Sequence, residues 1–249
     1  MPVHFSNLKQ FALSPAHYKQ SIDAPFEPTR GMRIGTVVHH LVLGPSNIRP
    51  LIKFDGDSRR GKEWTSFKAA HPEKEIVTAT EWEEAIPMAE AVLRDPVAAG
   101  LLKGARTEIP LEWDDAGIKC ATRGVDVIGD GFLADLKTTT CTEPQAWTRH
   151  ATKLLYHCQM SWYENGAKSN GIDVSRGLKL IGVESSAPYA VTVLNLGEAV
   201  RLQGRKSLTI WLERLRTCLE NDFWPAYAQS EVEFELPAWM GDDEGGEDE

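Results

Sequence analysis

Two aspartates and a lysine lie on either side of a short turn in the middle of the chain. Asp130-Gly131 separates two apolar runs, which is typical of a two-residue β-hairpin turn whose residues both need positive φ. Counting outward from that turn, Asp126 on the first strand faces Asp135 on the second. Side chains alternate along a strand, so Lys137 shares a face with Asp135. The spacing therefore predicts one hairpin face that carries two carboxylates and an ammonium.

Like charges in directly opposed positions destabilise a hairpin. Two carboxylates about 5 Å apart repel by roughly 3 kcal/mol at an effective dielectric of about 20. Lys137 offsets part of this repulsion, and Gly124 would lie opposite it to leave room. A divalent cation offsets more, since Mg²⁺ takes hard oxygen donors and keeps waters for a substrate phosphate. We expect metal-dependent attack on a phosphoryl group, with Lys137 orienting the water or stabilising developing charge; the alternative is a solvated hairpin with incidental charges.

The composition restricts the class of protein without identifying it. The 249-residue chain is 25% charged and 42% hydrophobic, with a formal net charge of −9. It has no run of the about 18 to 20 apolar residues that a membrane span needs and no secretory signal, so we expect a cytoplasmic protein. Four scattered cysteines argue against a clustered zinc or iron–sulfur site. Six acids in the last nine residues predict a disordered tail at 241–249, and without them residues 1–240 carry −3, which does not exclude a DNA partner.

Helix and strand signals follow one another without a repeat or a long linker, so we expect one α/β domain over residues 1–240. Periodicity and capping residues predict a helix that begins at Ser14-Pro15 and further helices over 34–43, 80–93, 143–153, 156–168 and 198–221. Apolar runs predict strands over 107–113, 118–128, 132–138, 178–183 and 189–196. A connection rich in proline, glycine and charge is expected over about 45–61.

The hairpin resembles the core of the PD-(D/E)XK nuclease superfamily, with Asp126 as the first motif acid and Asp135-Leu136-Lys137 as the second motif. An ordered set of motifs is similar to one branch, the RecE-like (exonuclease VIII C-terminal domain-like) nucleases of phages and prophages. Besides the hairpin, these motifs are Phe5-Ser-Asn-Leu-Lys, Ser14-Pro-Ala-His-Tyr18, Gly35-Thr-Val-Val-His39, Thr107-Glu-Ile-Pro-Leu-Glu-Trp113, Tyr156-His-Cys-Gln-Met-Ser-Trp-Tyr163, Val183-Glu-Ser-Ser-Ala-Pro-Tyr189 and Trp224-Pro-Ala-Tyr227. The resemblance implies a restriction-endonuclease-like fold, in which helices flank a central mixed β-sheet.

The resemblance also implies which residues hold the metal. His39 and His40 share a helix, and spacing alone does not choose between them, but the G-T-x-x-H pattern falls on His39. Implied metal ligands are His39, Asp126, Asp135 and the backbone carbonyl of Leu136. Four residues are expected to be catalytic: Asp126, Asp135, Lys137 and Glu108, the last as an additional acid near the metal on the preceding strand. Glu112 is expected to be solvated.

Substrate contacts are expected from a helix and a loop. Gln159 and Tyr163 lie four residues apart and so share a helix face. From the residues alone a polar pair at the edge of the core is as good an interpretation, whereas the resemblance implies contact with the substrate backbone and adds Tyr156.

Basic residues of a glycine-containing loop, Arg59, Arg60 and Lys62, are expected to contact phosphate, the alternative being a solvated charge run. Arg30 and Arg33 could serve the same groove. The role of Arg123 stays open.

The function implied by the resemblance is a Mg²⁺-dependent 5′-to-3′ double-stranded DNA exonuclease, in which Mn²⁺ can replace Mg²⁺. It would generate single strands for phage-type recombination by annealing, inside a bacterial host cell. Implied partners are duplex DNA ends, a single-strand annealing protein and further copies of the chain in a ring. The alternatives are an endonuclease of the same fold, of restriction or repair type, and a non-catalytic module that binds DNA or a partner, the latter through the acidic tail.

Overall fold

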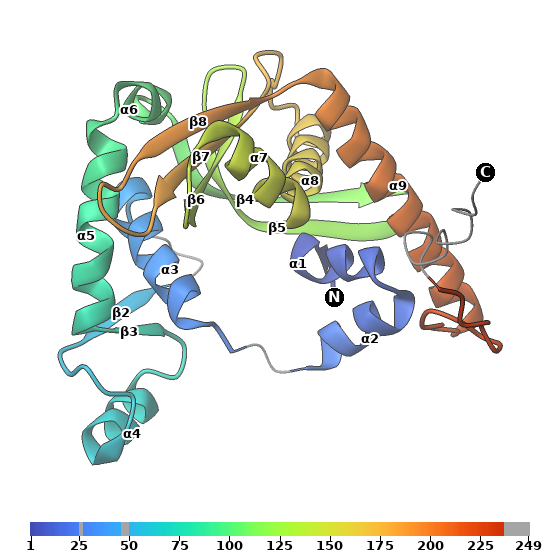
Figure 1. Ribbon diagram of the computed structural model, residues 1–249, viewed down its shortest axis with the longest axis horizontal. Coiled ribbons are helices and arrows are strands. Elements are labelled where there is room, and N and C mark those ends of the chain that lie inside the picture. Colours follow the sequence, from blue (N-terminus) through green and yellow to red (C-terminus); the bar gives the residue numbers. More distant parts are fainter. Residues whose placement is uncertain (25–26, 46–49, 237–249) are drawn as a thin grey trace, which may run out of the picture.

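The structure is a computed structural model that describes residues 1–24, 27–45 and 50–236 (Figure 1). Helices cover both faces of a central mixed sheet, which confirms the predicted α/β fold class. The predicted acidic tail at 241–249 and the last residues of the predicted domain lie outside the described residues.

Six strands of the described residues form the central sheet. They are β1 (Val3–His4), β4 (Arg106–Asp115), β5 (Ile118–Ile128), β6 (Leu133–Thr139), β7 (Leu178–Glu184) and β8 (Val191–Leu196). β5 is antiparallel to β4 and β6, β7 is parallel to β6, and β8 is antiparallel to β7. β7 is buried at nearly every position, as expected for a strand covered on both faces.

Each face of the sheet has its own hydrophobic core. One core contains residues of α1 (Phe5–Leu8), the 3₁₀ helix η1 (Lys9–Ala12), α2 (Pro15–Asp23), α7 (Pro144–Lys153), α8 (Tyr156–Ser169) and α9 (Glu198–Asn221). The other contains residues of α3 (Arg30–Leu43), α5 (Ala79–Arg94) and α6 (Pro96–Leu102). The two sets of helices can be followed on either side of the sheet in Figure 1. The sheet thus carries α3 on one face and α8 on the other, and both helices reach the site described below.

The hairpin has the predicted register. Val127 pairs with Ala134 and Ile128 with Leu133, and the N–H of Gly129 donates to the carbonyl of Phe132 at 3.0 Å. Asp126 and Asp135 therefore stand at corresponding positions. The turn itself differs from the prediction, because of its two residues only Gly131 has positive φ (72°), and Asp130 does not.

Most predicted elements are present, and several short ones are not anticipated by the sequence. β5 and α9 have the predicted bounds, and α2 begins as expected, with Ser14 Oγ accepting from the N–H of His17. The elements that the sequence did not predict are β1, β2 (Leu51–Phe54), α4 (Gly61–Ala70), β3 (Glu75–Thr78) and α6. They contain two to ten residues each, too few for a periodic pattern to stand out.

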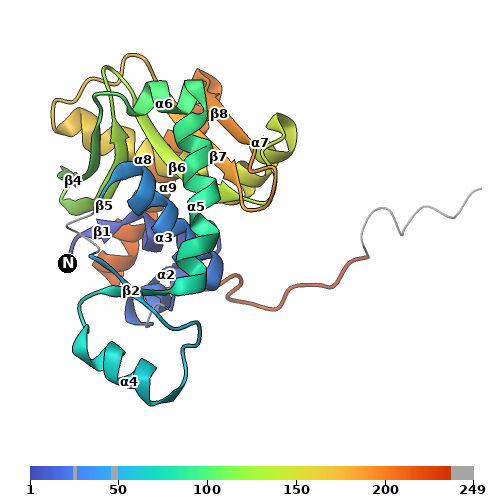
Figure 2. The same cartoon turned by 90° about the vertical axis from the view of Figure 1, so that its left-hand side faces the viewer.

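Three of the unexpected elements form a small unit beside α3 and α5. β2 and β3 pair in parallel, and α4 connects them. Figure 2 shows α4 projecting from the body of the molecule, and this helix has no buried residue. Its inner side packs on Phe54, whose ring lies 5.4 Å from that of Trp64 and 5.1 Å from that of Phe67.

Candidate functional site

The candidate site lies where β5 and β6 separate. Their pairing covers only two residue pairs and ends at Val127 and Ala134. Beyond this point a side chain replaces backbone pairing between the two strands: Asp126 Oδ2 accepts a hydrogen bond from the N–H of Leu136 at 2.8 Å. Asp126, only 6% exposed, is thereby fixed inside the fork between the two strands.

Three potential metal ligands from three elements meet at this fork. His39 comes from α3, Glu108 from β4 and Asp126 from β5, and their ligand atoms lie within 4.8 Å of one another. His39 Nδ1 is 3.7 Å from both Glu108 Oε1 and Asp126 Oδ2. The neighbouring His40 instead packs edge-on against Trp82, with 5.5 Å between ring centroids.

His39 is oriented by the backbone of β6. Its Nε2 lies 2.8 Å from the carbonyl oxygen of Leu136, so Nε2 carries a proton and donates it there. Nδ1 then faces Glu108 and Asp126. Unprotonated, it offers a lone pair to a cation; protonated, it is a second hydrogen-bond donor. The Leu136 carbonyl, an implied metal ligand, is engaged by His39 in this arrangement.

Glu108 reaches the cluster because β4 is irregular. The pairing of β4 with β5 shifts between Ile109 and Leu111, and Glu108 itself has a φ of 54°. A Cβ at Gly124 would lie 3.1 Å from Glu108 Oε2. The expectation that Gly124 leaves room for Lys137 is wrong: β5 and β6 have already separated there, and the space admits Glu108.

Asp135 and Lys137 form the second half of the site. Asp135 is fully buried and its carboxylate contacts the Lys137 ammonium. Among the described residues, neither Asp135 oxygen accepts a hydrogen bond from any other group. Burial acts to lower the pKa of Lys137, but Asp135 and Asp126 outweigh it and raise that pKa to about 12. The ammonium form of Lys137 is therefore favoured, and this form donates hydrogen bonds.

The Asp126 carboxylate is only partly compensated. Burial raises the pKa of Asp126 to about 7, since the effect of Asp135 adds to it and His39 opposes it incompletely. Glu108, Asp126 and Asp135 bring three carboxylates to the fork, where His39 faces the first two and Lys137 contacts the third. A divalent cation fits this set, because it adds positive charge beside Asp126 and prefers oxygen and imidazole ligands. His39, Glu108 and Asp126 would hold it, with Asp135 beside them.

The predicted substrate residues of α8 lie at one side of the fork. The ring centroid of Tyr156 is 5.2 Å from Lys137 Nζ, which brings this tyrosine into the site. Gln159 Nε2 donates to Tyr163 Oη at 2.8 Å, as expected for two residues one helical turn apart. Tyr163 is nearly buried, whereas Gln159 is partly exposed.

The structure separates the predicted basic cluster into two parts. Arg59 is partly exposed, and its Nη2 donates to Ile76 O at 2.7 Å and to Glu81 Oε2 at 2.6 Å. Its guanidinium also stacks on Trp64, 4.8 Å from the ring centroid. Arg60 and Lys62 are exposed at the start of α4. Arg59 is therefore bound to structural partners, whereas Arg60 and Lys62 extend into solvent.

The two arginines before His39 likewise have structural partners. Arg33 Nε lies 2.7 Å from Glu81 Oε1, and Arg30 contacts Glu84. Glu81 also closes a capping box with Thr78 at the start of α5. These contacts join α3 to α5 and so fix the helix that carries His39.

The N-terminal strand β1 pairs with β5, which the sequence did not predict. β4 lines one edge of β5 along its whole length. On the other edge, β6 pairs at Val127 and Ile128, and β1 pairs at Cys120 and Ala121. β1 runs parallel to β5, so the chain that follows it, α1 and η1, continues toward the fork.

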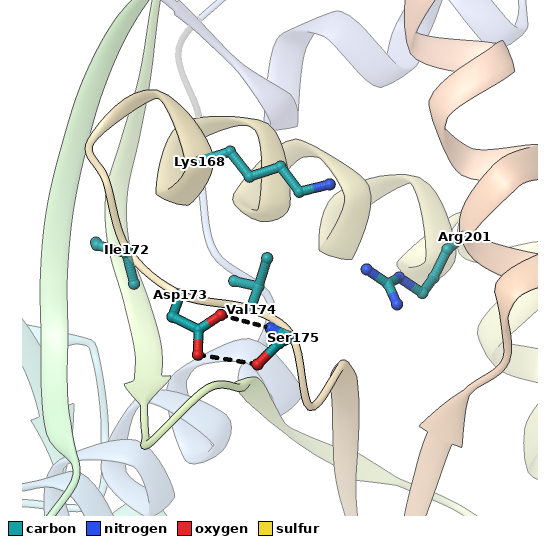
Figure 3. A pocket seen from close by; sticks show the side chains of 6 residues that line it. All are labelled: Lys168, Ile172, Asp173, Val174, Ser175 and Arg201. Atoms are coloured by element: carbon teal, nitrogen blue, oxygen red, sulfur yellow. Dashed lines mark hydrogen bonds between the residues drawn. The ribbon is translucent and has the colours of Figure 1, made fainter.

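A separate hollow lies at the far end of α8 (Figure 3). Its lining residues are Lys168, Ile172, Asp173, Val174, Ser175 and Arg201. The Asp173 carboxylate of this hollow accepts from Ser175 N and Oγ at 2.9 Å each (Figure 3). Arg201 and Lys168 contact the buried Glu164, although Arg201 Nε has no hydrogen-bond partner among the described residues. None of the predicted site residues lines it.

A mixed sheet whose central strands fork around Asp126, Asp135 and Lys137 defines a PDDEXK-like domain. Residues 4–234 match the family described as PDDEXK-like domain of unknown function (DUF3799). The chain belongs to this family, and the predicted resemblance to the PD-(D/E)XK nuclease superfamily is confirmed. No curated protein matches the sequence.

One solved structure shows the same fold, and two others match more weakly. A crystal structure of an exonuclease candidate from Eubacterium rectale has a TM-score of 0.61 at 13% identity, and the match covers 96% of this chain and 91% of that one. An alkaline exonuclease from Laribacter hongkongensis has a TM-score of 0.31 at 17% identity over 74% of this chain and 89% of that one. Its complex with dAMP has a TM-score of 0.29 at 16% identity over 77% and 93% of the two chains. TM-scores of about 0.3 do not establish a common fold for these last two structures.

No helix among the described residues is both long and apolar enough to cross a lipid bilayer.

Proposed function

We propose that this protein is a Mg²⁺-dependent deoxyribonuclease that degrades duplex DNA from an end. The observation that supports this most is the fork itself, where the incompletely compensated Asp126 lies with His39 and Glu108 beside the Lys137 ammonium. Metal-dependent phosphodiester hydrolysis uses both features. Carboxylate oxygens bind the metal ion, and a positive charge faces the negative charge that develops on the phosphate.

When bound, the cation would polarise a phosphoryl oxygen and lower the pKa of a coordinated water. Residues of the chain position the cation and the attacking water. Asp126 is fixed by the Leu136 N–H and His39 by the Leu136 carbonyl, so the two ligands share one rigid piece of backbone. Lys137, held by Asp135 and bordered by Tyr156, orients the attacking water or stabilises the charge that develops on the phosphate.

DNA contacts in this proposal come from both sides of the fork. Tyr156, Gln159 and Tyr163 on α8 contact the substrate backbone near the cut. Arg60 and Lys62 contact phosphates farther along the duplex, whereas Arg59 positions the loop that carries them.

Digestion of labelled duplexes tests the proposal. We expect Mg²⁺ or Mn²⁺ to support progressive loss of linear duplex from 5′-labelled ends, and chelator to abolish it. Lys137→Ala and His39→Ala should abolish digestion, whereas His40→Ala, a matched change at the next residue, should retain it. Full activity of Lys137→Ala would reject the site.

Closed circular DNA separates the proposal from its alternatives. An end-dependent exonuclease leaves the circle intact, and cleavage of the circle would identify an endonuclease of the same fold. If the chain binds DNA but cleaves neither substrate with any divalent metal, it is a non-catalytic module.

The wider role that we propose is recombination, in which the exposed single strand passes to an annealing protein. Homo-oligomers should form around the duplex in this case. Light scattering after size-exclusion chromatography, with and without duplex DNA, measures the number of copies; a monomer under both conditions would exclude the ring.

A further inference from the structure

The chain that follows α9 is fastened to α2 and then leaves the body of the molecule. The ring of Trp224 stacks on that of Tyr18, with 5.9 Å between their centroids. Tyr227 in turn packs on His17, with 5.3 Å between ring centroids. Figure 2 shows residues 228–236 extending away from the helices and the sheet. These contacts therefore fix the point from which the segment departs.

Residues 231–236 have the pattern of a β-strand that lacks a partner. Acids and apolar residues alternate strictly in Glu231-Val-Glu-Phe-Glu-Leu236, which is the period of a strand with one apolar face. The apolar side chains of Val232, Phe234 and Leu236 are 77%, 89% and 62% exposed. No strand of the described residues pairs with this segment. An exposed row of apolar side chains on such a segment indicates a surface that binds another protein chain.

β8 offers a sheet edge that matches this segment. Among the described residues β8 pairs only with β7, and it has six residues, none of them charged or proline. Glu184 and Ala190 continue the register of β7 and β8, and Glu184 N donates to Ala190 O at 3.0 Å. Hydrogen-bonded pairs alternate along an antiparallel ladder, so the N–H and C=O groups of Val191, Val193 and Asn195 point to the free edge.

The other strand edges fit the segment less well. β4 pairs only with β5 among the described strands, but it carries Pro110 and several acids, which would repel the three glutamates of the segment. β2 and β3 have only four residues each. Charge and length therefore both favour β8.

The segment is too far from the β8 of its own chain. α9 begins two residues after β8 ends, and its 24 residues extend about 36 Å to the end from which the segment departs. From Tyr227, which α2 holds, Glu231 is four residues farther and reaches about 14 Å at most. Figure 1 shows α2 and the end of α9 lying apart from β8. The β8 that the segment can reach is therefore that of another copy.

We propose that residues 231–236 of one copy add as a β-strand to the free edge of β8 in a second copy. The apolar side chains of the added strand pack beside Val191 and Val193, which adjoin the core under α5 and α6, and its glutamates face away. The contact is heterologous, since each copy supplies one segment and one edge, and it generates a ring or an open chain of copies. The inference goes beyond the proposed activity and does not depend on it.

Association measured without DNA or metal tests the inference. Sedimentation velocity over a range of concentrations should show that the wild type associates. Phe234→Ser should weaken association by about tenfold or more, as expected when a large apolar side chain is lost from an interface. Leu219→Ser, which removes an apolar side chain that is 59% exposed on α9, is the matched control and should leave association unchanged.

The edge of β8 is tested by a change of the backbone. Val193→Pro removes an N–H that points to the free edge and places a ring in the path of the added strand, so it should weaken association as much as Phe234→Ser does. Val193→Thr keeps the N–H and should retain association. If Val193→Pro does not unfold cooperatively, Val191→Pro at the first residue of β8 takes its place.

A mixture of the two defective variants gives the sharpest test. Val193→Pro keeps an intact segment and Phe234→Ser keeps an intact edge, so each alone should remain monomeric. An equal mixture should form one intact contact and therefore a dimer, but nothing larger. A mixture that stays monomeric would overturn the inference.

Two further outcomes would overturn the inference. The first is a wild type that is monomeric at every concentration, or an association that survives Phe234→Ser. The second is an association that Phe234→Ser abolishes and folded Val193→Pro retains, which would place the segment on a surface other than β8. Digestion of linear duplex is measured separately, so failure of the proposed function would leave this result unchanged.

Discussion

Two groups of buried acids in this molecule are built in opposite ways. Glu164 on α8 is 0% exposed and contacts three cations, Lys168 at 2.7 Å, Arg201, and Arg205 at 3.3 Å. Burial acts to raise its pKa, but Arg201 and Lys168 outweigh burial and lower it. At the fork, Asp126 is similarly buried, yet its pKa rises to about 7, because burial and Asp135 prevail over His39.

The difference distinguishes a structural acid from the acids of the proposed site. Contacts with Arg201, Arg205 and Lys168 compensate Glu164 and join α8 to α9. Glu81 similarly joins α3 to α5 through Arg33, and its contact with Arg59 holds the loop before α4. Asp126 is less fully compensated, which in our proposal costs stability in the free protein and provides affinity for a cation. Charge balance, more than burial, therefore marks the site at which we propose that chemistry occurs.

Removing the central acid of the fork should have the largest effect. Asp126→Asn keeps the acceptor for the Leu136 N–H and removes one negative charge, so digestion of linear duplex should fall by about 10³-fold or more. The free energy of unfolding of the metal-free protein should stay equal or increase. Loss of both activity and stability would mean that Asp126 is a structural acid like Glu164.

The reverse result is expected for the compensated acid. Glu164→Gln removes the buried counter-charge of Arg201 and Arg205, which keep, among the described residues, only the exposed Glu198, and should lower the free energy of unfolding by about 3 kcal/mol. Activity per folded molecule should remain near that of the wild type. Urea denaturation and the duplex assay at low temperature measure the two quantities; full stability with lost activity would contradict the comparison.

Metal should stabilise one group of acids and not the other. Mg²⁺ at about one hundred times its dissociation constant should raise the free energy of unfolding by about 2.7 kcal/mol. The increase should persist in Glu164→Gln and vanish in Asp126→Asn. Thermal unfolding with Mg²⁺ and with chelator provides the measurement, and an equal shift in Asp126→Asn would place the metal elsewhere.

The smallest effect should be the pH dependence of metal binding. The pKa of Asp126 is raised, and that of His39 is raised too, since Asp126 and Glu108 outweigh the lowering effect of burial. Both groups bind protons more tightly in the folded state than in the unfolded state, so the metal-free protein loses stability as the pH rises toward and through about 7.

Metal competes with these protons, so its affinity should rise with pH by up to about tenfold per unit and level off above about pH 7 for Asp126. Calorimetric titrations with Mg²⁺ between about pH 5.5 and 8.5 measure this rise. An affinity independent of pH would show that Asp126 is ionised before the metal arrives.

The sequence by itself determined the hairpin and the chemistry on its face. Asp130-Gly131 between apolar runs set the register, and alternation then placed Asp126, Asp135 and Lys137, because these are local properties of paired strands. Glu164 and Arg59 show the limit of prediction from the sequence. Both are charged residues in polar patterns, and the local sequence does not predict whether an ion-pair partner lies far along the chain.

Only the tertiary structure decided which charges are compensated. It brings His39 from α3 and Glu108 from an irregular β4 to the fork. It also places Glu108 in the space beside Gly124 and pairs Arg59 with Glu81. It further pairs β1 with β5, through a two-residue strand too short to leave a pattern in the sequence. The reason is that charge balance depends on distances between elements, which the fold sets and neither spacing nor alternation encodes.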